Sequence, residues 1–130
     1  MKLLLDTHIL IWAASAPGKI GKAATRRLED SRTELWFSPL SLLEIFNLNT
    51  KGRIGHGDPR WWFPELKREL GLIEAPVTSE IAFETSHFTI PTGDPVDRLL
   101  VATARILKLT FFTADEPIIQ SGSVAVLPNR

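Results

Sequence analysis

Residues 2–12 read KLLLDTHILIW: the run Lys2–Leu5, then Asp6, then a second apolar run that begins at Ile9. An apolar run followed by a residue that can cap a helix predicts a buried strand that leads directly into a helix. Asp6 then lies at the carboxyl end of the strand, the edge of a parallel sheet where ligands bind. Asp is also a common helix N-cap, so a capping role and a site role both stand at this point.

The composition predicts one domain over residues 1–130. The chain has 130 residues, 44% of them hydrophobic, which is enough for one core and too few for two. It has no cysteine, which excludes disulfides and thiolate metal sites, so we expect a cytoplasmic protein. Lys plus Arg equals Asp plus Glu at 15 each, so net charge predicts no partner.

The apolar N-terminal segment predicts core rather than a targeting or membrane segment. It contains Lys2 and Asp6 and lacks a small-residue cleavage pattern. No stretch of the sequence approaches the roughly 18 consecutive apolar residues of a membrane span. We therefore expect neither a secretory signal nor a transmembrane helix.

Strand-like and helix-like segments alternate along the whole chain. The predicted strands are Lys2–Leu5, Glu34–Phe37, Leu72–Ala75, Leu109–Thr113 and Val124–Leu127. The predicted helices are the segment after Asp6, Ile20–Ser31, Pro39–Thr50, Asp58–Leu70 with a disturbance at Pro64, Thr78–Phe88, Asp94–Lys108 and a short turn near Pro117. This alternation predicts an α/β fold, a three-layer α/β/α sandwich with a mainly parallel central sheet.

Four carboxylates are candidates for one site. Asp6 and Asp115 each follow a predicted strand, so both are expected at the carboxyl edge of the sheet. Glu44 lies inside an apolar helix, too deep to be a cap, and Asp97 lies in the first turn of another apolar helix. Converging carboxylates about 4 Å apart repel by about 4 kcal/mol at an effective dielectric constant of ~20, so they imply a compensating cation.

Helix capping is the alternative explanation for three of these acids. Asp6 caps the first helix in this interpretation, and Asp115 caps the turn at Pro117. Asp94 is the N-cap before Pro95, with Asp97 as its partner in a capping box, and a further metal ligand is the alternative role of Asp94. Glu44 resists this explanation, because no Lys or Arg lies within a helical turn of it.

Oxygen ligands without cysteine select a hard cation, so the expected cofactor is Mg²⁺ or Mn²⁺. An ion of this kind lowers the pKa of bound water and shields phosphate oxygens. Phosphodiester hydrolysis is therefore the natural reaction class.

With these residues assembled, the sequence resembles a PIN-domain ribonuclease of the VapC type, the toxin of prokaryotic VapBC toxin–antitoxin modules. The likeness rests on four stretches in order, LLLDTHILIW, SPLSLLEI, GDPVDRLLVATA and FFTADEPI, which span residues 3–118. The resemblance implies a Mg²⁺- or Mn²⁺-dependent endoribonuclease whose metal site is formed by Asp6, Glu44, Asp97 and Asp115. It also implies a VapB-like antitoxin, an RNA substrate and a homodimer in the prokaryotic cytoplasm.

The resemblance also singles out residues around the acids. Thr7 and Thr113 match small hydroxyl positions that orient carboxylates or water, although both also fit local capping and strand roles. Arg98 fits either a phosphate contact or a partner for the acids. Where the family often has aromatic residues, this chain has Leu43 and Val96, two changes that we expect to affect packing only.

A basic and aromatic segment is a candidate contact surface. Lys51, Arg53, Trp61 and Trp62 belong to a stretch in which cations and aromatics interleave, as in single-stranded RNA binding surfaces. The same tryptophans also fit the core, or a groove that receives the antitoxin.

Two rival functions come from other classes. A haloacid-dehalogenase-like phosphohydrolase would use Asp6 as its nucleophile, but the second Asp that it needs two residues later is His8 here. A non-catalytic binding module would use the acids only as caps, and it would bind no divalent metal.

Overall fold

The predicted first strand is the central strand of the sheet. In the computed structural model, which describes residues 1–130, β1 (Lys2–Leu5) pairs with a neighbour on each side. The sheet has five strands in the order β3-β2-β1-β4-β5, and every pair is parallel. The other strands are β2 (Glu34–Phe37), β3 (Ile73–Glu74), β4 (Thr110–Thr113) and β5 (Val126–Pro128).

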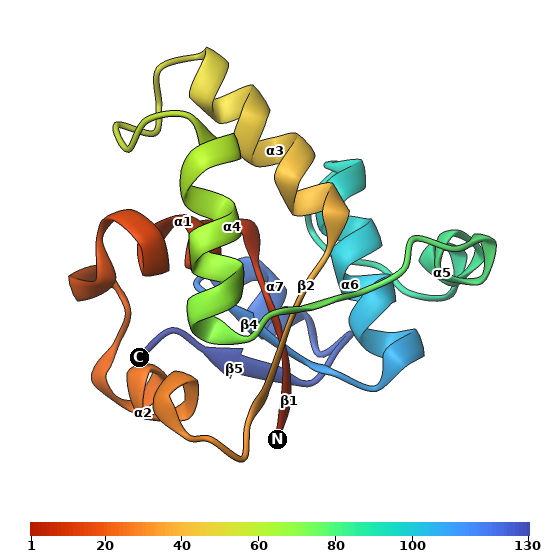
Figure 1. Ribbon diagram of the computed structural model, residues 1–130. Helices are drawn as coiled ribbons and strands as arrows, with labels where there is room; N and C mark the ends of the chain where they lie inside the picture. The colour runs from red at the N-terminus through yellow and green to blue at the C-terminus, as the bar shows by residue number, and fades with distance from the viewer.

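Helices cover both faces of this sheet, as Figure 1 shows. Side chains of a strand alternate between faces, so a strand buried on both sides reads as a continuous apolar run. Leu3 and Leu5 lie in one core cluster, whereas Leu4 lies in the other, and all three are fully buried. The predicted three-layer α/β/α sandwich with a parallel sheet is confirmed.

The helices follow the order that the sequence predicts. Seven α-helices and two single-turn 3₁₀ segments are present: α1 (Thr7–Ser15), η1 (Pro17–Lys19), α2 (Lys22–Glu29), α3 (Pro39–Thr50), α4 (Pro59–Leu70), α5 (Ser79–Glu84), η2 (Thr85–His87), α6 (Pro95–Leu107) and α7 (Glu116–Ser121). None of the helices combines the length and apolar composition that crossing a bilayer requires.

Polar residues followed by proline start three of these helices. The side chains of Ser38, Asp58 and Asp94 each accept a hydrogen bond from the backbone amide two residues later, and the intervening residue is proline at the first helical position. The helix starts predicted from these pairs are confirmed. α4 continues through Pro64, which lies on the exposed side of the helix, so the disturbance predicted there does not interrupt it.

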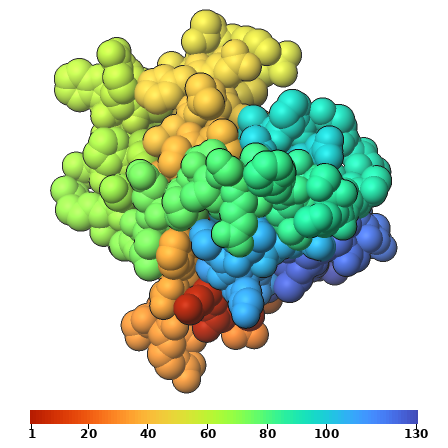
Figure 2. Space-filling model, turned by 90° about the vertical axis from the view of Figure 1, so that its right-hand side faces the viewer, coloured from red at the N-terminus to blue at the C-terminus, as the bar shows by residue number.

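The segment predicted as one helix from Thr78 to Phe88 is shorter and divided. α5 ends at Glu84, and a 3₁₀ turn follows. The hydroxyls of Thr85 and Ser86 donate to the carbonyls of Ala82 and Phe83, both at 2.7 Å, and so compete with regular helical bonds. Figure 2 shows this segment (green to teal) lying across one face of the molecule.

Three other predicted elements differ at their ends. α2 begins at Lys22 rather than Ile20, because η1 occupies the preceding residues. β3 is limited to Ile73–Glu74 because it is an edge strand that pairs with β2 alone. β5 begins at Val126, two residues later than predicted.

The sheet order places a crevice beside β1. The chain passes from β1 outward to β2 and β3, and then returns to β4 on the opposite side of β1. Connections therefore leave in opposite directions from the carboxyl ends of β1 and β4. Such a reversal is the usual ligand-binding position of open parallel sheets.

Lys108, which ends α6, generates a stability prediction. It is the one residue other than glycine with a positive φ, 57°. A Cβ is strained in this left-handed conformation, so Lys108→Gly should stabilise the protein by about 0.5–1 kcal/mol in urea unfolding. Lys108→Ala removes the same charge but keeps the Cβ, and it should give no such gain. Equal effects of both variants would contradict the prediction.

Candidate active site

The four predicted acids meet at the crevice between β1 and β4. They line a pocket of about 300 Å³ together with a fifth acid, Asp94. The complete lining is Asp6, His8, Trp12, Glu44, Asp94, Asp97, Ala114 and Asp115. Residues far apart in the sequence are thus brought to one place by the strand order and by the starts of α1, α6 and α7.

Asp6 is buried, with 9% of its surface exposed, and both of its carboxylate oxygens are held. One accepts a hydrogen bond of 2.7 Å from the Thr7 amide, so Asp6 caps α1. The other accepts a bond of 2.6 Å from the Thr113 hydroxyl at the end of β4. Asp6 is therefore both a cap and a pocket residue, and the two interpretations of the sequence are compatible.

Glu44 is oriented by α1. The Thr7 hydroxyl donates to Glu44 Oε1 at 2.5 Å and lies 3.0 Å from the hydroxyl of Ser41. Ser41 is fully buried and lies three residues before Glu44, on the same side of α3. Ser41 was not predicted from the sequence, although its helical spacing from Glu44 indicates that the two side chains are neighbours.

Thr92, also missed from the sequence, joins two of the acids. Its hydroxyl accepts from the Asp94 amide at 3.1 Å and lies 3.4 Å from Asp97 Oδ2, to which it donates. The predicted capping box is therefore wrong, because Thr92 takes the amide that Asp97 was expected to bond. Asp94 does cap α6 through the Val96 amide at 2.9 Å, as predicted.

Asp94 is also part of the acidic cluster. Glu44, Asp94 and Asp97 each offer one carboxylate oxygen such that the three oxygens lie within 4.8 Å of one another. Asp115 caps α7 by accepting from the Ile118 amide at 3.1 Å, and its own amide donates to the Thr113 hydroxyl at 3.0 Å. Thr113 thus links Asp115 to Asp6.

The negative charge of the pocket has no basic partner. None of the five carboxylates takes part in an ion pair with Lys, Arg or His. Burial, followed by the charges of Asp6, Asp94, Glu44 and Asp115, raises the pKa of Asp97 to about 7. Burial also raises the pKa values of Asp6 and Glu44.

The donor set fits a hard divalent cation. Five carboxylates supply only oxygen ligands, and no thiol is present in the chain. A divalent ion would offset the mutual repulsion that, after burial, raises the pKa of Asp97. The pocket can therefore hold a metal ion at the carboxyl edge of the sheet.

Comparison with known proteins identifies the family. The family model described as "PIN domain" matches residues 3–120. The chain belongs to the PIN domain family. The curated protein Ribonuclease VapC22 of Mycobacterium tuberculosis is 30% identical over 106 residues, which cover 78% of each chain.

Three solved structures share the PIN fold of this chain at low sequence identity. VapBC2 from Rickettsia felis, bound to a promoter DNA fragment, has a TM-score of 0.72 at 15% identity and covers 98% of both chains. DNA-bound VapBC from Salmonella typhimurium has a TM-score of 0.66 at 15% identity and covers 100% of this chain and 99% of that one. FitAB bound to IR36 DNA has a TM-score of 0.60 at 18% identity, with coverages of 98% and 94%.

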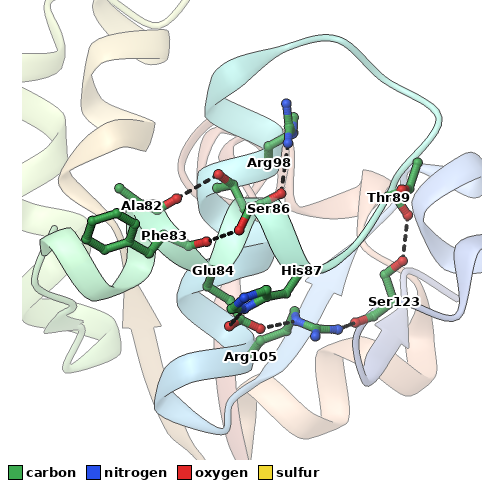
Figure 3. Close-up of polar contacts among 10 residues, drawn as sticks. Ala82, Phe83, Glu84, Ser86, His87, Thr89, Arg98, Arg105 and Ser123 are labelled. Atoms are coloured by element: carbon green, nitrogen blue, oxygen red, sulfur yellow. Dashed lines mark hydrogen bonds and ion pairs between the residues drawn. The ribbon is translucent and has the colours of Figure 1, made fainter.

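Arg98 of this PIN domain does not pair with the acids, and its predicted phosphate contact stays a prediction. It follows Asp97, but its Nη2 donates to the carbonyl of Thr85 at 2.8 Å. Figure 3 shows Arg98 directed at the α5–η2 segment, and Arg105 between Glu84 and Ser123. Arg98 therefore ties α6 to its neighbouring helix and does not partner the acids.

The basic and aromatic segment divides between core and surface. Trp62 is 8% exposed and belongs to the larger core cluster, so its side chain offers almost no surface to RNA or a protein. Trp61 is 77% exposed on the other side of α4. Lys51 and Arg53 are exposed in the loop after α3.

Of the two departures from the family pattern, Leu43 lies at the surface, whereas Val96 is half-buried against the smaller core cluster. Leu43 is 66% exposed, and with Phe46 and Val96 it lines an apolar hollow of about 430 Å³ that includes Glu44. The side chain of Leu43 lies outside the core, on the outer side of α3 next to Glu44, and the expectation that the change leaves the ligands unaffected stays a prediction.

The raised pKa values predict an unusual pH dependence of the metal-free PIN domain. The folded state keeps protons that the unfolded chain has lost, so stability falls as pH rises from about 4 through about 7. Without metal, the Tm at pH 8 should be lower than at pH 5.5, by on the order of 5 °C. Asp97→Asn should reduce this difference. A metal-free Tm that rises over the same interval would contradict the prediction.

Proposed function

We propose that this protein is a divalent-metal-dependent endoribonuclease and the toxin of a toxin–antitoxin pair. The observation that carries the proposal is the pocket of five unpaired carboxylates at the carboxyl edge of a PIN-domain sheet. The relative named Ribonuclease VapC22 supports RNA as the substrate. The proposal treats residues 1–130 as a single PIN domain.

In this proposal Asp6, Glu44, Asp97 and Asp115 hold Mg²⁺ or Mn²⁺, with Asp94 as an additional ligand. When bound, the ion supplies Lewis acidity and positive charge for the attack of water on an RNA phosphodiester. Thr113 and the Thr7 amide fix both oxygens of Asp6, while the Thr7 hydroxyl fixes Glu44. These bonds orient the carboxylates before any ligand arrives, which lowers the cost of assembling the site.

The partners in the proposal are a VapB-like antitoxin, an RNA substrate and a second copy of the chain. The structures named VapBC2 and VapBC support an antitoxin partner, because the names of these complexes pair VapC-type chains with VapB. The proposal places the protein in the prokaryotic cytoplasm, together with its RNA and antitoxin. No observation favours the phosphohydrolase or the non-catalytic module as a second candidate.

Asp97→Asn should abolish RNA cleavage without unfolding the protein. The change removes one charged oxygen from the pocket, and it also relieves repulsion, so the Tm of metal-free protein should hold or rise. We expect cleavage of total cellular RNA to fall by at least about 100-fold. The matched control is Asp58→Asn, since Asp58 is likewise an aspartate at the start of a helix but pairs with Arg60, away from the pocket. Equal losses in both variants would refute the assignment.

Metal removal should stop the same reaction. Purified protein free of antitoxin should give discrete RNA cuts with Mg²⁺ or Mn²⁺ and none with excess EDTA, because the acids alone repel the phosphate. Readdition of either ion should restore the cuts. Cleavage that persists in EDTA would exclude a metal-dependent mechanism.

A further inference from the structure

Two side chains distinguish one wall of the acidic pocket. Besides the five acids and Ala114, the lining contains only His8 and Trp12. Both belong to α1 and lie four residues apart, so they are neighbours on the same side of the helix. His8 is exposed and Trp12 is half-buried, so both present surface beside the acids.

A cation lies next to these two rings. The His8 and Trp12 ring centroids are 5.9 Å apart, with the planes inclined at 53°. The ammonium of Lys19, which is exposed in η1, lies 5.9 Å from the centroid of the Trp12 ring. An imidazole, an indole and an ammonium group therefore follow one another, and the first two line the acidic pocket.

The negative charge of the pocket makes aromatic and cationic side chains beside it important for binding RNA. A nucleic acid carries phosphates on both sides of the one that is cut, and five carboxylates repel them. Affinity for the flanking nucleotides must then come from base stacking and from cations outside the acidic cluster. A base stacked on an aromatic side chain raises affinity by about 5- to 100-fold, largely independent of sequence.

Other exposed surfaces fit this requirement less well. In the basic and aromatic segment, Arg60 is paired with Asp58 and Arg68 with Glu65, while Trp62 is buried. The hollow beside Glu44 is lined by Leu43, Phe46 and Val96 and has no cation in its lining. Only the wall formed by α1 and η1 joins the pocket to both aromatic rings and a cation without an acidic partner.

We propose that His8, Trp12 and Lys19 seat a nucleotide of single-stranded RNA next to the phosphodiester that is cleaved. A base stacks on Trp12 beside His8, and Lys19 contacts the following phosphate. This inference rests on the proposed ribonuclease function. In this inference α1 positions the substrate, and the base stacks on Trp12 rather than on Trp61.

The test measures binding and turnover separately. Binding of a fluorescein-labelled, mixed-sequence 12-nucleotide RNA is followed by anisotropy, with every variant in an Asp97→Asn background to prevent cleavage. Trp12→Leu should raise Kd by about 5- to 100-fold, whereas Trp12→Phe retains an aromatic face and should keep most of the affinity. Trp61→Leu is the matched control and should leave Kd unchanged. In the active background, Trp12→Leu should raise KM with little change in kcat.

Trp12 also packs against the core, so Trp12→Leu could lose affinity through misfolding. Lys19 is exposed, and Lys19→Gln therefore tests RNA binding without this complication. It should weaken binding and lower the salt dependence, the slope of log K against log salt, by about 1. Unchanged Kd and salt slope in Lys19→Gln, or equal losses in Trp12→Leu and Trp61→Leu, would overturn the inference.

Further outcomes distinguish failure of the proposed nucleotide site from failure of the proposed ribonuclease function. If the wild type cuts total RNA with Mg²⁺ but the Trp12 and Lys19 variants bind and cut as it does, the nucleotide seat is wrong and the ribonuclease stands. If Trp12→Leu loses affinity only for the antitoxin chain, the surface belongs to a protein partner and the inference also fails. Absence of any cutting or binding by the folded wild type would overturn the proposed function and this inference together.

Discussion

The hydrogen bonds of the buried Asp6 carboxylate are the interaction on which the rest of the structure depends. Its two oxygens join the start of α1, through the Thr7 amide, to the end of β4, through the Thr113 hydroxyl. β1 and β4 are the strands on either side of the crevice. The Asp6 side chain therefore connects their carboxyl ends and also lines the pocket. A carboxylate buried in this way is costly unless its oxygens are bonded, and both are.

Much of the fold could be predicted because its signals are local. The leucine run of β1 is buried on both faces, and the Ser-Pro and Asp-Pro pairs mark helix starts by backbone geometry alone. The four-residue error at the end of α5 has a different origin. There, the hydroxyls of Thr85 and Ser86 compete for carbonyls, a choice that helix periodicity does not contain.

The candidate site was predictable in its residue types and less so in its contacts. Strand ends indicated Asp6 and Asp115, and the apolar surroundings of Glu44 and Asp97 indicated acids without partners. The contacts of Thr7 with Ser41 and Glu44 depend on how α1 packs on α3, and that of Thr92 with Asp97 depends on the conformation of the loop before α6. The partner of Arg98 was not predictable either, since adjacency to Asp97 in the sequence does not set the direction of its side chain.

The negative charge of the pocket carboxylates, which no basic side chain compensates, links the fold to the proposed function. Capping and metal binding are compatible uses of the same carboxylates. The caps of Asp94 and Asp115 each occupy one oxygen, and the two bonded oxygens of Asp6 each keep a further lone pair. Diffraction from crystals grown with Mn²⁺, measured for the manganese anomalous signal, tests this most directly. The account predicts an anomalous peak in the pocket bounded by Asp6, Glu44, Asp97 and Asp115. An ordered pocket without a peak, at Mn²⁺ concentrations that saturate RNA cleavage, would contradict it.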